Sequence, residues 1–161
     1  MVQEQMKILL MRGLPGCGKS TWVAKRPEPK IVCSADDALI TDGVYKHDPI
    51  KVAEGHDACL NKYVDCLRGI LVPPKGEPYE VIVDNTNTGA LELAPYVQLA
   101  IAHKIPYEIV YVLCSVELSL KRNTHSVPAL TILNMSHNLT ERLPPWWKVK
   151  VICQEDLHVQ S

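Results

Sequence analysis

Short apolar runs alternate with longer segments of mixed polarity along this chain. Five apolar runs have the length of β-strands, at 7–11, 30–34, 80–84, 107–114 and 148–153. Strands buried in a parallel sheet are nearly continuous in their apolar character, and the first four runs fit that pattern. Five further segments have helical content, at 20–25, 50–71, 91–103, 116–121 and 130–142. This alternation predicts an α/β fold with three layers around a mostly parallel sheet.

The segment 50–71 carries the clearest helical period. Its apolar positions, among them Val52, Cys59 and Tyr63, recur at three- and four-residue spacing. That spacing is typical of an amphipathic helix that packs one face on a sheet. His56 lies on the same face, and we interpret it as a core-edge histidine, with acceptor binding as the alternative. The run 72–78, rich in proline, predicts a flexible loop.

The stretch GLPGCGKS at 13–20 matches the pattern G-x-x-x-x-G-K-[ST] at every fixed position. It follows a predicted strand and opens a predicted helix, which is the context expected of a phosphate-binding loop. Backbone N–H groups of such a loop converge on phosphate oxygens, and the helix N-terminus adds its positive dipole end. The alternative is a glycine turn that leads to an exposed lysine. We expect the nucleotide to bind at Gly13, Pro15, Gly16, Cys17, Gly18, Lys19, Ser20 and Thr21.

Three residues of this motif carry specific expectations. Lys19 is expected to reach the β- and γ-phosphates of ATP and to act in catalysis, and the Ser20 hydroxyl is expected to ligate Mg²⁺. Cys17 fills a variable position, where a helix N-terminus and a nearby lysine favour the thiolate. We interpret Cys17 as a tolerated small residue that is sensitive to oxidation.

Acidic residues follow two of the predicted strands. Asp36 and Asp37 come after the run 30–34, and Asp84 ends the run 80–84. Side chains at the carboxyl ends of strands in an open α/β sheet converge on the ligand crevice. A kinase uses one carboxylate to accept a hydroxyl proton and another near Mg²⁺, and we assign Asp36 as the catalytic base. For Asp37 we prefer an N-cap or first-turn position of a helix that follows.

Short polar residues continue directly after Asp84. Asn85, Thr86 and Asn87 either form a tight turn that caps the next helix or line the acceptor side of the site. Both roles are compatible for Thr86 and Asn87. The predicted substrate-binding set is therefore Asp36, Asp84, Thr86 and Asn87.

The basic segment SLKRNTHSVP at 119–128 follows the fourth strand and its short helix. Its cationic group is placed to supply positive charge over the nucleotide, as lid arginines do when they neutralise a transferring phosphoryl group. Arg122 is the candidate for nucleotide binding and catalysis, whereas Lys121 is interpreted as solvated. His125 is either a phosphate contact or an ordinary loop histidine.

Length and composition bound these interpretations. With 161 residues, 47% hydrophobic content and a net charge of −1, the chain fits a single domain over 1–161. It has no apolar run of membrane-spanning length and no signal-like start, so we expect a cytoplasmic protein with no membrane contact.

Its six cysteines lack metal-site spacing and are interpreted as small buried hydrophobes. Near-neutral charge restricts any nucleic-acid contact to a local surface, and no obligate protein partner is evident.

Taken together, the motifs GLPGCGKSTW, SADD, VDNTN and KRNTHSVP resemble those of the P-loop polynucleotide 5′-hydroxyl kinases. The resemblance implies a P-loop kinase fold with a five-stranded sheet in the order 2-3-1-4-5 and a short lid. It implies transfer of the γ-phosphate of ATP, with Mg²⁺, to the 5′-hydroxyl end of DNA or RNA. By motif position it assigns Lys19 and Ser20 to phosphate and Mg²⁺, Asp36 to the general base and Arg122 to the lid arginine.

Two positions depart from the pattern of that family. The phage members carry an arginine three residues after the catalytic aspartate, which grips the acceptor phosphate, and this chain has Leu39 there. They also carry a second lid arginine, where this chain offers only His125 nearby. The alternatives to a polynucleotide kinase are a small-molecule P-loop kinase and a nucleotide-binding module without phosphoryl transfer. For the tryptophans of LPPWWKVK at 143–150, we prefer packing in the core or beside adenine over base stacking.

Overall fold

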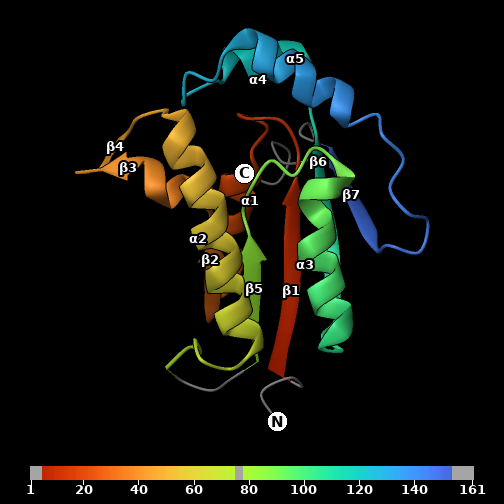
Figure 1. Ribbon diagram of the computed structural model, residues 1–161. Helices are drawn as coiled ribbons and strands as arrows, with labels where there is room; N and C mark the ends of the chain where they lie inside the picture. The colour runs from red at the N-terminus through yellow and green to blue at the C-terminus, as the bar shows by residue number, and fades with distance from the viewer. Residues whose placement is uncertain (1–4, 75–77, 154–161) are drawn as a thin grey trace.

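The computed structural model describes residues 5–74 and 78–153 (Figure 1). Five strands form one sheet in the order β2-β5-β1-β6-β7, and every pairing in it is parallel. This order confirms the predicted sheet and its α/β class. The elements follow along the chain as β1 (Met6–Arg12), α1 (Lys19–Ala24), β2 (Lys30–Cys33), η2 (Ala35–Leu39), β3 (Ile40–Thr41), β4 (Val44–Tyr45), α2 (Pro49–Leu67), β5 (Tyr79–Val83), α3 (Ala90–Ala102), β6 (Tyr107–Leu113), α4 (Val116–Lys121), α5 (Ala129–Asn138) and β7 (Val149–Cys153).

Helices cover both faces of the sheet. Successive side chains of a strand point to opposite faces, so β1 contributes to two cores. Ile8 and Leu10 pack in a cluster with side chains of α2 and α3, whereas Leu9 and Met11 pack with Val23 of α1. Figure 1 shows α2 and α3 in front of the sheet, α1 behind it, and α4 with α5 across the carboxyl ends of the strands. The last pair occupies the place of the predicted lid.

Helix α2 begins and ends at residues whose conformations suit helix termini. The Asp48 carboxylate accepts a hydrogen bond from the Ile50 N–H at 3.0 Å, and Pro49 fills the first turn, where its missing N–H costs nothing. The helix ends at Leu67, four residues before the predicted boundary. Gly69 follows with a φ of 72°, a left-handed conformation that often stops a helix. Of the predicted loop 72–78, residues 75–77 lie outside the described residues.

Between β2 and α2 the structure has two elements that the hydrophobic pattern did not predict. The 3₁₀ helix η2 begins where the Ser34 hydroxyl accepts a hydrogen bond from the Asp36 N–H at 3.2 Å, and it carries Asp37 in its first turn, as preferred. The hairpin β3–β4 turns through Asp42 and Gly43, whose φ values are 53° and 77°. An Asp-Gly turn with two positive φ values is typical of a tight hairpin. Strands of two residues are too short to show an alternating pattern.

Two basic side chains fix the far end of α1 to the sheet. The Lys30 ammonium donates hydrogen bonds to the carbonyls of Val23, Ala24 and Arg26 at 3.1, 3.1 and 2.9 Å. These carbonyls lie at the C-terminal end of the helix, where partners are missing and the dipole is negative. The Arg26 guanidinium pairs with both carboxylate oxygens of Glu80 on β5, at 2.8 and 2.6 Å. The helix that begins at Lys19 is therefore anchored at its other end.

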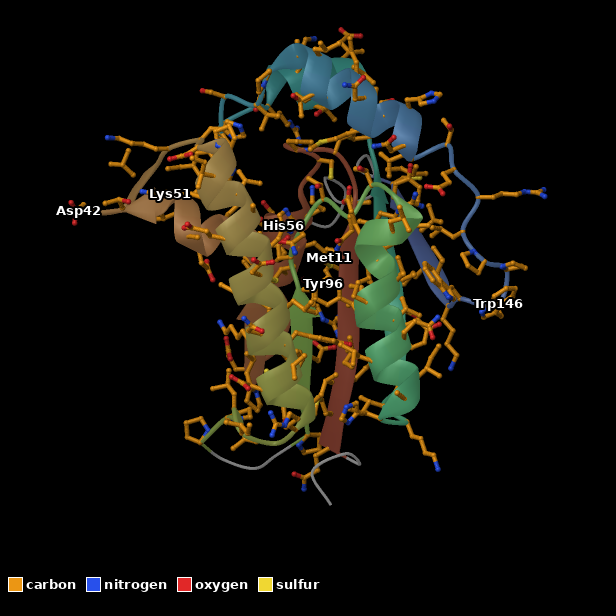
Figure 2. The ribbon with its side chains drawn as sticks, viewed as in Figure 1. Met11, Asp42, Lys51, His56, Tyr96 and Trp146 are labelled. Atoms are coloured by element: carbon orange, nitrogen blue, oxygen red, sulfur yellow. The ribbon has the colours of Figure 1, made fainter. Side chains whose placement is uncertain are left out.

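The two tryptophans have different environments. Trp147 is buried in the same cluster as the α2 and α3 side chains, which agrees with the preferred packing role. Trp146 is 72% exposed, so the preferred packing role was wrong for it, and Figure 2 shows it on the outer side of the segment before β7.

Candidate active site

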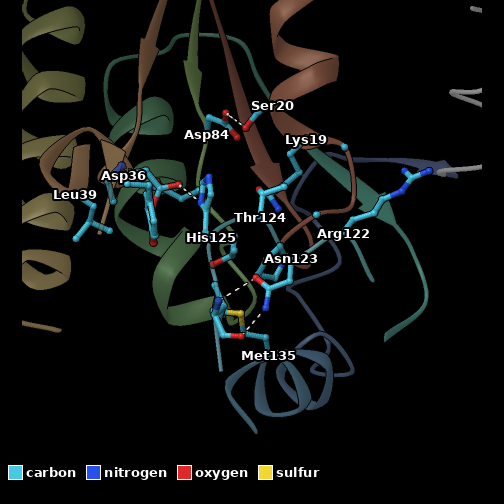
Figure 3. Close-up of a pocket in the computed structure, with 18 of the residues that line it drawn as sticks. Lys19, Ser20, Asp36, Leu39, Asp84, Arg122, Asn123, Thr124, His125 and Met135 are labelled. Atoms are coloured by element: carbon cyan, nitrogen blue, oxygen red, sulfur yellow. Dashed lines mark hydrogen bonds and ion pairs between the residues drawn. The ribbon is translucent and has the colours of Figure 1, made fainter. Parts of the chain in front are cut away.

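A cavity of about 690 Å³ lies at the carboxyl ends of the strands, between the sheet and the lid (Figure 3). Its walls come from the loop after β1, the start of α1, η2, β4, α2, the turn after β5 and the lid. Among the residues singled out from the sequence, it is lined by Pro15, Gly16, Gly18, Lys19, Ser20, Thr21, Asp36, Asp84, Thr86 and Arg122. Gly13, Cys17 and Asn87 do not line it, and their positions are described below.

The loop at 13–18 approaches its neighbours closely enough to require glycine at two positions. A Cβ atom on Gly13 would lie 2.6 Å from the carbonyl oxygen of Val112. Gly16 has a φ of 71°, and a Cβ there would lie 2.6 Å from the carbonyl oxygen of Arg122. Both contacts are far inside normal van der Waals distance. Gly13 therefore lets the loop pack on the Val112 backbone, and Gly16 lets it pack on the Arg122 backbone at the base of the lid.

Lys19 projects back over the loop from the first turn of α1. Its ammonium donates hydrogen bonds to the carbonyls of Gly13 and Leu14 at 2.9 and 2.7 Å, and the residue is 8% exposed. A buried ammonium requires such partners because its desolvation is costly. The Lys19 charge is thus held at the mouth of the loop, where phosphate oxygens are expected.

Ser20 and Asp84 meet on the floor of the cavity. The Ser20 hydroxyl donates a hydrogen bond to the Asp84 carboxylate at 2.9 Å (Figure 3). Burial raises the pKa of Asp84, while the Ser20 hydrogen bond and the Lys19 charge oppose that rise. A hydroxyl and a carboxylate are both hard oxygen donors of the kind that Mg²⁺ prefers. The donor set therefore fits the expected cation.

Asp36 faces the same cavity from η2. Its carboxylate lies 3.6 Å from Nδ1 of His125 in the lid, and its side chain is 47% exposed. The neighbouring Asp37 is exposed and does not line the cavity. Of the two aspartates after β2, Asp36 alone therefore lines the cavity.

The three polar residues after Asp84 divide between structure and cavity. Asn85 and Thr86 line the cavity, and Asn85 also accepts a hydrogen bond from the Ala35 N–H at 2.9 Å, which links η2 to the end of β5. Asn87 is buried with a φ of 45°, and its amide donates to the Met11 carbonyl at 2.8 Å. The predicted substrate-binding role of Asn87 is thus replaced by a structural one, because its side chain satisfies the backbone of β1.

Arg12 is a functional-site neighbour that the sequence reasoning missed. It is 3% exposed at the end of β1, and its guanidinium donates to the carbonyls of Asn87 and Thr88 at 3.2 and 2.9 Å. Its guanidinium carbon lies 5.0 Å from the ring centre of Tyr111. Burial lowers the pKa of Arg12. The sequence signal for Arg12 was a charged residue directly before the glycine loop. Arg12 fixes the turn after β5 through its two hydrogen bonds.

Arg122 ends α4 and lines the cavity at the base of the lid. Figure 3 shows its side chain extending away from Asp36 and His125, on the side of the loop that holds Lys19. A second contact ties the lid to the loop, since the buried Ser119 hydroxyl donates to the Pro15 carbonyl at 2.6 Å. Arg122 therefore lies on the side of the cavity formed by the loop at 13–18.

Cys17 is fully buried beneath the loop, in agreement with its interpretation as a small packed residue. A hydrogen bond with Cys114 and the charge of Lys19 outweigh burial and lower the pKa of Cys17 to about 6. The same hydrogen bond raises the pKa of Cys114. The Lys19 ammonium lies 3.6 Å from the Cys17 sulfur. Cys17 thus contributes to the charge balance under the loop and not to the cavity surface.

The wall opposite the loop is built from aromatic and apolar side chains. His56 is exposed and lines the cavity from α2, so its interpretation as a core-edge histidine was wrong, and Figure 2 shows it near the upper end of that helix. Tyr45, which the sequence analysis did not consider, lines the cavity from β4 and stacks on His125 with ring centres 4.0 Å apart. Leu39 of η2 adds an apolar side chain to this wall, and Met135 of α5 lines the cavity from the lid. The hairpin that carries Tyr45 had to be known before Tyr45 could be found.

Comparison with known sequences places most of this site within one family model. The model, described as an AAA domain (AAA_33), matches residues 8–126. Human NEDD4-binding protein 2 is 32% identical to the chain over 107 residues, which are 65% of this chain and 6% of that protein. The chain therefore corresponds to a small part of that relative.

Comparison with solved structures finds the same fold in several proteins. Kti12 of Chaetomium thermophilum, solved with ADP-AlF₃, has a TM-score of 0.59 at 18% identity, with 95% of this chain and 92% of that chain covered. A gluconokinase from Sinorhizobium meliloti has a TM-score of 0.52 at 13% identity, with 96% and 97% covered. The tunicamycin resistance protein of Deinococcus radiodurans has a TM-score of 0.51 at 12% identity, with 96% and 92% covered. At these identities the similarity establishes a P-loop kinase-like fold.

Across residues 5–74 and 78–153, no helix is both long enough and apolar enough to span a membrane.

Proposed function

We propose, on the premise that the chain belongs to the AAA_33 family of AAA domains and has a P-loop kinase-like fold, that it is a kinase of polynucleotide 5′-hydroxyl ends. ATP is the proposed phosphoryl donor and Mg²⁺ the proposed cofactor. The observation that carries the proposal is the position of Asp36. This carboxylate shares one cavity with Lys19, Ser20 and Asp84 and stands on the wall away from the phosphate loop.

In the proposed reaction, Asp36 accepts the proton of the acceptor hydroxyl while the hydroxyl oxygen forms a bond to the γ-phosphorus of ATP. The bond between the γ-phosphorus and the β,γ-bridging oxygen breaks, and its electron pair leaves on ADP. The half-exposed Asp36 carboxyl then releases the proton to water. Asp36 thus needs contact with both the acceptor and solvent, and its exposure provides both.

The phosphate loop and the residues that follow it hold the donor. Lys19 exchanges its loop carbonyls for β- and γ-phosphate oxygens, and backbone N–H groups at the start of α1 face the same oxygens. Ser20 and Asp84 would hold Mg²⁺, which supplies positive charge to the β- and γ-phosphates when bound. Arg122 supplies further charge at the base of the lid. The structure of Kti12 with ADP-AlF₃ supports a nucleotide in a fold of this kind.

A small-molecule hydroxyl acceptor is the second candidate, and one observation favours it. The lysines and arginines that line the cavity within the described residues are Lys19, Lys25 and Arg122, all from the loop, α1 or the base of the lid. The opposite wall carries Leu39, where a phosphate-gripping arginine is expected of the phage kinases. A phosphodiester backbone gains affinity from such cations, whereas a neutral sugar does not require them.

The decisive experiment is transfer of labelled γ-phosphate from ATP to 5′-hydroxyl DNA and RNA oligonucleotides. The proposal expects label on these strands and none on the same strands with a 5′-phosphate. Lys19→Ala should abolish labelling. If ATP binds but neither DNA nor RNA is labelled, a panel of small polyols and nucleosides tests the second candidate, and no transfer to any of them would indicate a binding module.

A matched pair of variants tests the base. Asp36→Asn should reduce transfer by roughly 10²-fold or more while ATP binding is retained, because general-base catalysis contributes on that scale. Asp37→Asn is the control, since Asp37 is exposed outside the cavity and carries the same charge one residue away. Full transfer by Asp36→Asn would rule out the assigned base.

A further inference from the structure

The lid turn at 123–127 is closed by its own hydrogen bonds, and it places His125 in the wall of the cavity. The Asn123 amide donates to the Val127 carbonyl at 2.6 Å and accepts from the Val127 N–H at 2.9 Å. The Thr124 N–H donates to the Arg122 carbonyl at 2.8 Å, and Ser126 adopts a φ of 51°. These bonds close the turn around His125. His125 is therefore held at a fixed place and not at the end of an open loop.

His125 contacts two separate elements of the opposite wall. Its ring stacks on Tyr45 of β4 with ring centres 4.0 Å apart and an interplanar angle of 19°. Its Nδ1 atom lies 3.6 Å from Oδ2 of Asp36 on η2, and Figure 3 shows the two side chains facing each other. Stacking fixes the plane of the imidazole, and the plane directs the ring nitrogen at the carboxylate.

The backbone links Tyr45 to Asp36 without passing through the lid. Tyr45 pairs with Ile40 in the hairpin, and the Lys46 N–H donates to the Leu39 carbonyl at 2.9 Å. The Ser34 cap fixes the backbone of Asp36, but it does not hold the carboxylate. A side chain that is 47% exposed needs a further contact to keep one orientation. His125 is the residue that provides it.

We infer that His125 is a positioning residue for the base, which makes lid placement and base orientation a single event. This inference rests on the proposed function of Asp36. Nδ1 of His125 lies 3.6 Å from Oδ2, an electrostatic contact longer than a hydrogen bond, which leaves Oδ1 to accept the proton of the acceptor hydroxyl. A base must be oriented to within a fraction of an ångström to act efficiently. The contact is formed only when the turn at 123–127 stands over Tyr45, so the base is oriented only when the lid covers the site.

Other charged or titratable side chains line the same cavity and bear on this contact. They come from the loop and α1, the segment before α2, α2 itself, the end of β5 and the base of the lid, and they are Lys19, Lys25, His47, His56, Asp84 and Arg122. Within residues 5–74 and 78–153, His125 is the ion-pair partner of Asp36 when its imidazole is protonated.

The kinetic test compares His125→Ala with His125→Gln in the intact chain, using the acceptor that the wild type labels best. His125→Ala should lower kcat roughly 10- to 100-fold, because the base loses its orientation, while KM for ATP stays within about twofold. His125→Gln should recover part of kcat, since its amide can still donate to the carboxylate. Tyr45→Ala should resemble His125→Ala, and Tyr45→Phe should retain most of the rate, because the stack needs the ring and not the hydroxyl.

His137→Gln is the matched control, because His137 is an exposed histidine in the last turn of α5. If the loss of any lid histidine impaired the lid, His137→Gln would also lower kcat. An unchanged kcat in His125→Ala, or a loss expressed only as a higher KM for ATP, would overturn the inference.

A spectroscopic arm does not depend on phosphoryl transfer. The ring ¹H–¹⁵N signals of His125, assigned with His125→Gln, should move in Asp36→Asn and in Tyr45→Ala and stay in place in Asp37→Asn. If the His125 ring signals did not move in Asp36→Asn, the contact would be refuted even in an active kinase. If the wild type labels no acceptor, the proposed function fails, and these signals still decide whether His125 and Asp36 interact.

Discussion

The Ser20 hydroxyl and the Asp84 carboxylate are joined by a 2.9 Å hydrogen bond across the floor of the cavity, although 64 positions separate them in the chain. The bond links the residue after Lys19 to the end of β5, and β5 is the neighbour of β1 in the sheet. It brings a hydroxyl and a carboxylate together where a nucleotide-bound cation is expected. Several consequences of this site can be measured.

Replacing Asp84 by Asn should separate stability from activity. Burial raises the pKa of Asp84, so the charged form is disfavoured in the folded protein. The folded state gains from Asp84 below the pKa of an unfolded aspartate, about 3.9, and this gain is lost as pH rises through the higher folded pKa. Asp84→Asn should therefore have a higher Tm than the wild type near pH 7, and the difference should shrink as pH falls toward 4.

The same Asp84→Asn variant should lose transfer activity by about 10- to 100-fold or more, as expected for loss of a group that holds or orients a cation. Thermal melts across pH and Mg²⁺ titrations of the transfer rate measure the two effects. A variant that melts below the wild type at pH 7 would contradict the sign of the pKa shift. Asp37→Asn serves as the control for loss of a negative charge close to the site.

Alanine at Gly16 should impair nucleotide binding more than alanine at Gly43. Both glycines have similar φ values, 71° and 77°, so both substitutions carry similar backbone strain of about 1–2 kcal/mol. A Cβ on Gly16 also meets the Arg122 carbonyl, whereas a Cβ on Gly43 meets nothing within 4 Å. Gly16→Ala should weaken ATP binding by on the order of 10-fold or more, because the loop and the base of the lid must move apart.

Isothermal titration of ATP into both variants, alongside their melting curves, measures the difference. Equal ATP affinities in Gly16→Ala and Gly43→Ala would show that the loop can move away from the base of the lid without weakening ATP binding.

Oxidation should inactivate the protein through Cys17. The hydrogen bond with Cys114 lowers the pKa of Cys17 to about 6, so the thiolate predominates at neutral pH. Cys17 is fully buried, so the reaction should be slow; hydrogen peroxide that reaches it would convert the thiolate to a sulfenic acid, which condenses with the Cys114 thiol to a disulfide and water. The inactivation rate should rise with pH through about 6 and then level off. A disulfide there would pull the loop away from the geometry that holds Lys19.

Peptide mass mapping after peroxide treatment identifies the modified residues, and Cys17→Ala should resist inactivation. Cys153→Ser is the control, since Cys153 is exposed on β7. Protection by Cys153→Ser with none by Cys17→Ala would assign the sensitivity to the surface.

Arg12→Met should destabilise the fold by about 1–3 kcal/mol, because the carbonyls of Asn87 and Thr88 would lose their buried donor. Arg68→Met is the matched control, because Arg68 is exposed at the end of α2 and surface changes usually stay within about 0.5 kcal/mol. Urea unfolding of both variants gives the free energies. Equal values would mean that water satisfies the two carbonyls as well as Arg12 does.

The strands and the phosphate loop could be predicted from sequence because both have dense local signals, whereas the strand order came from the resemblance to the P-loop polynucleotide kinases. Apolar runs such as the one that became β5 are continuous, and GLPGCGKS has spacing that few other structures share. Asp36 and Asp84 followed from a geometric rule, since carboxyl strand ends share one edge of the sheet. For each of these residues, the neighbouring residues in the chain were enough to predict its position.

The residues of the opposite wall were harder to predict from sequence, because their positions depend on short elements and tertiary contacts. Tyr45 lies on a strand of two residues, and His56 is exposed because the first turns of α2 extend beyond the sheet and over the cavity. Asn87 was assigned to the substrate on its residue type, yet its amide serves the Met11 carbonyl. The pairing of Arg12 with that same turn joins residues far apart in the chain and leaves no local pattern.

The central position of β1 has a consequence for how the chain matures on the ribosome. Met6 pairs with Tyr79 and Ile8 pairs with Tyr107, so β1 lacks both of its neighbours until the chain beyond Tyr107 has emerged. Parallel pairing over such separations is slow, because the loop entropy must be lost before the contacts form. The phosphate loop is therefore made early and assembled late. A nascent chain that stops before β6 would contain the complete glycine motif without the Val112 backbone on which Gly13 rests.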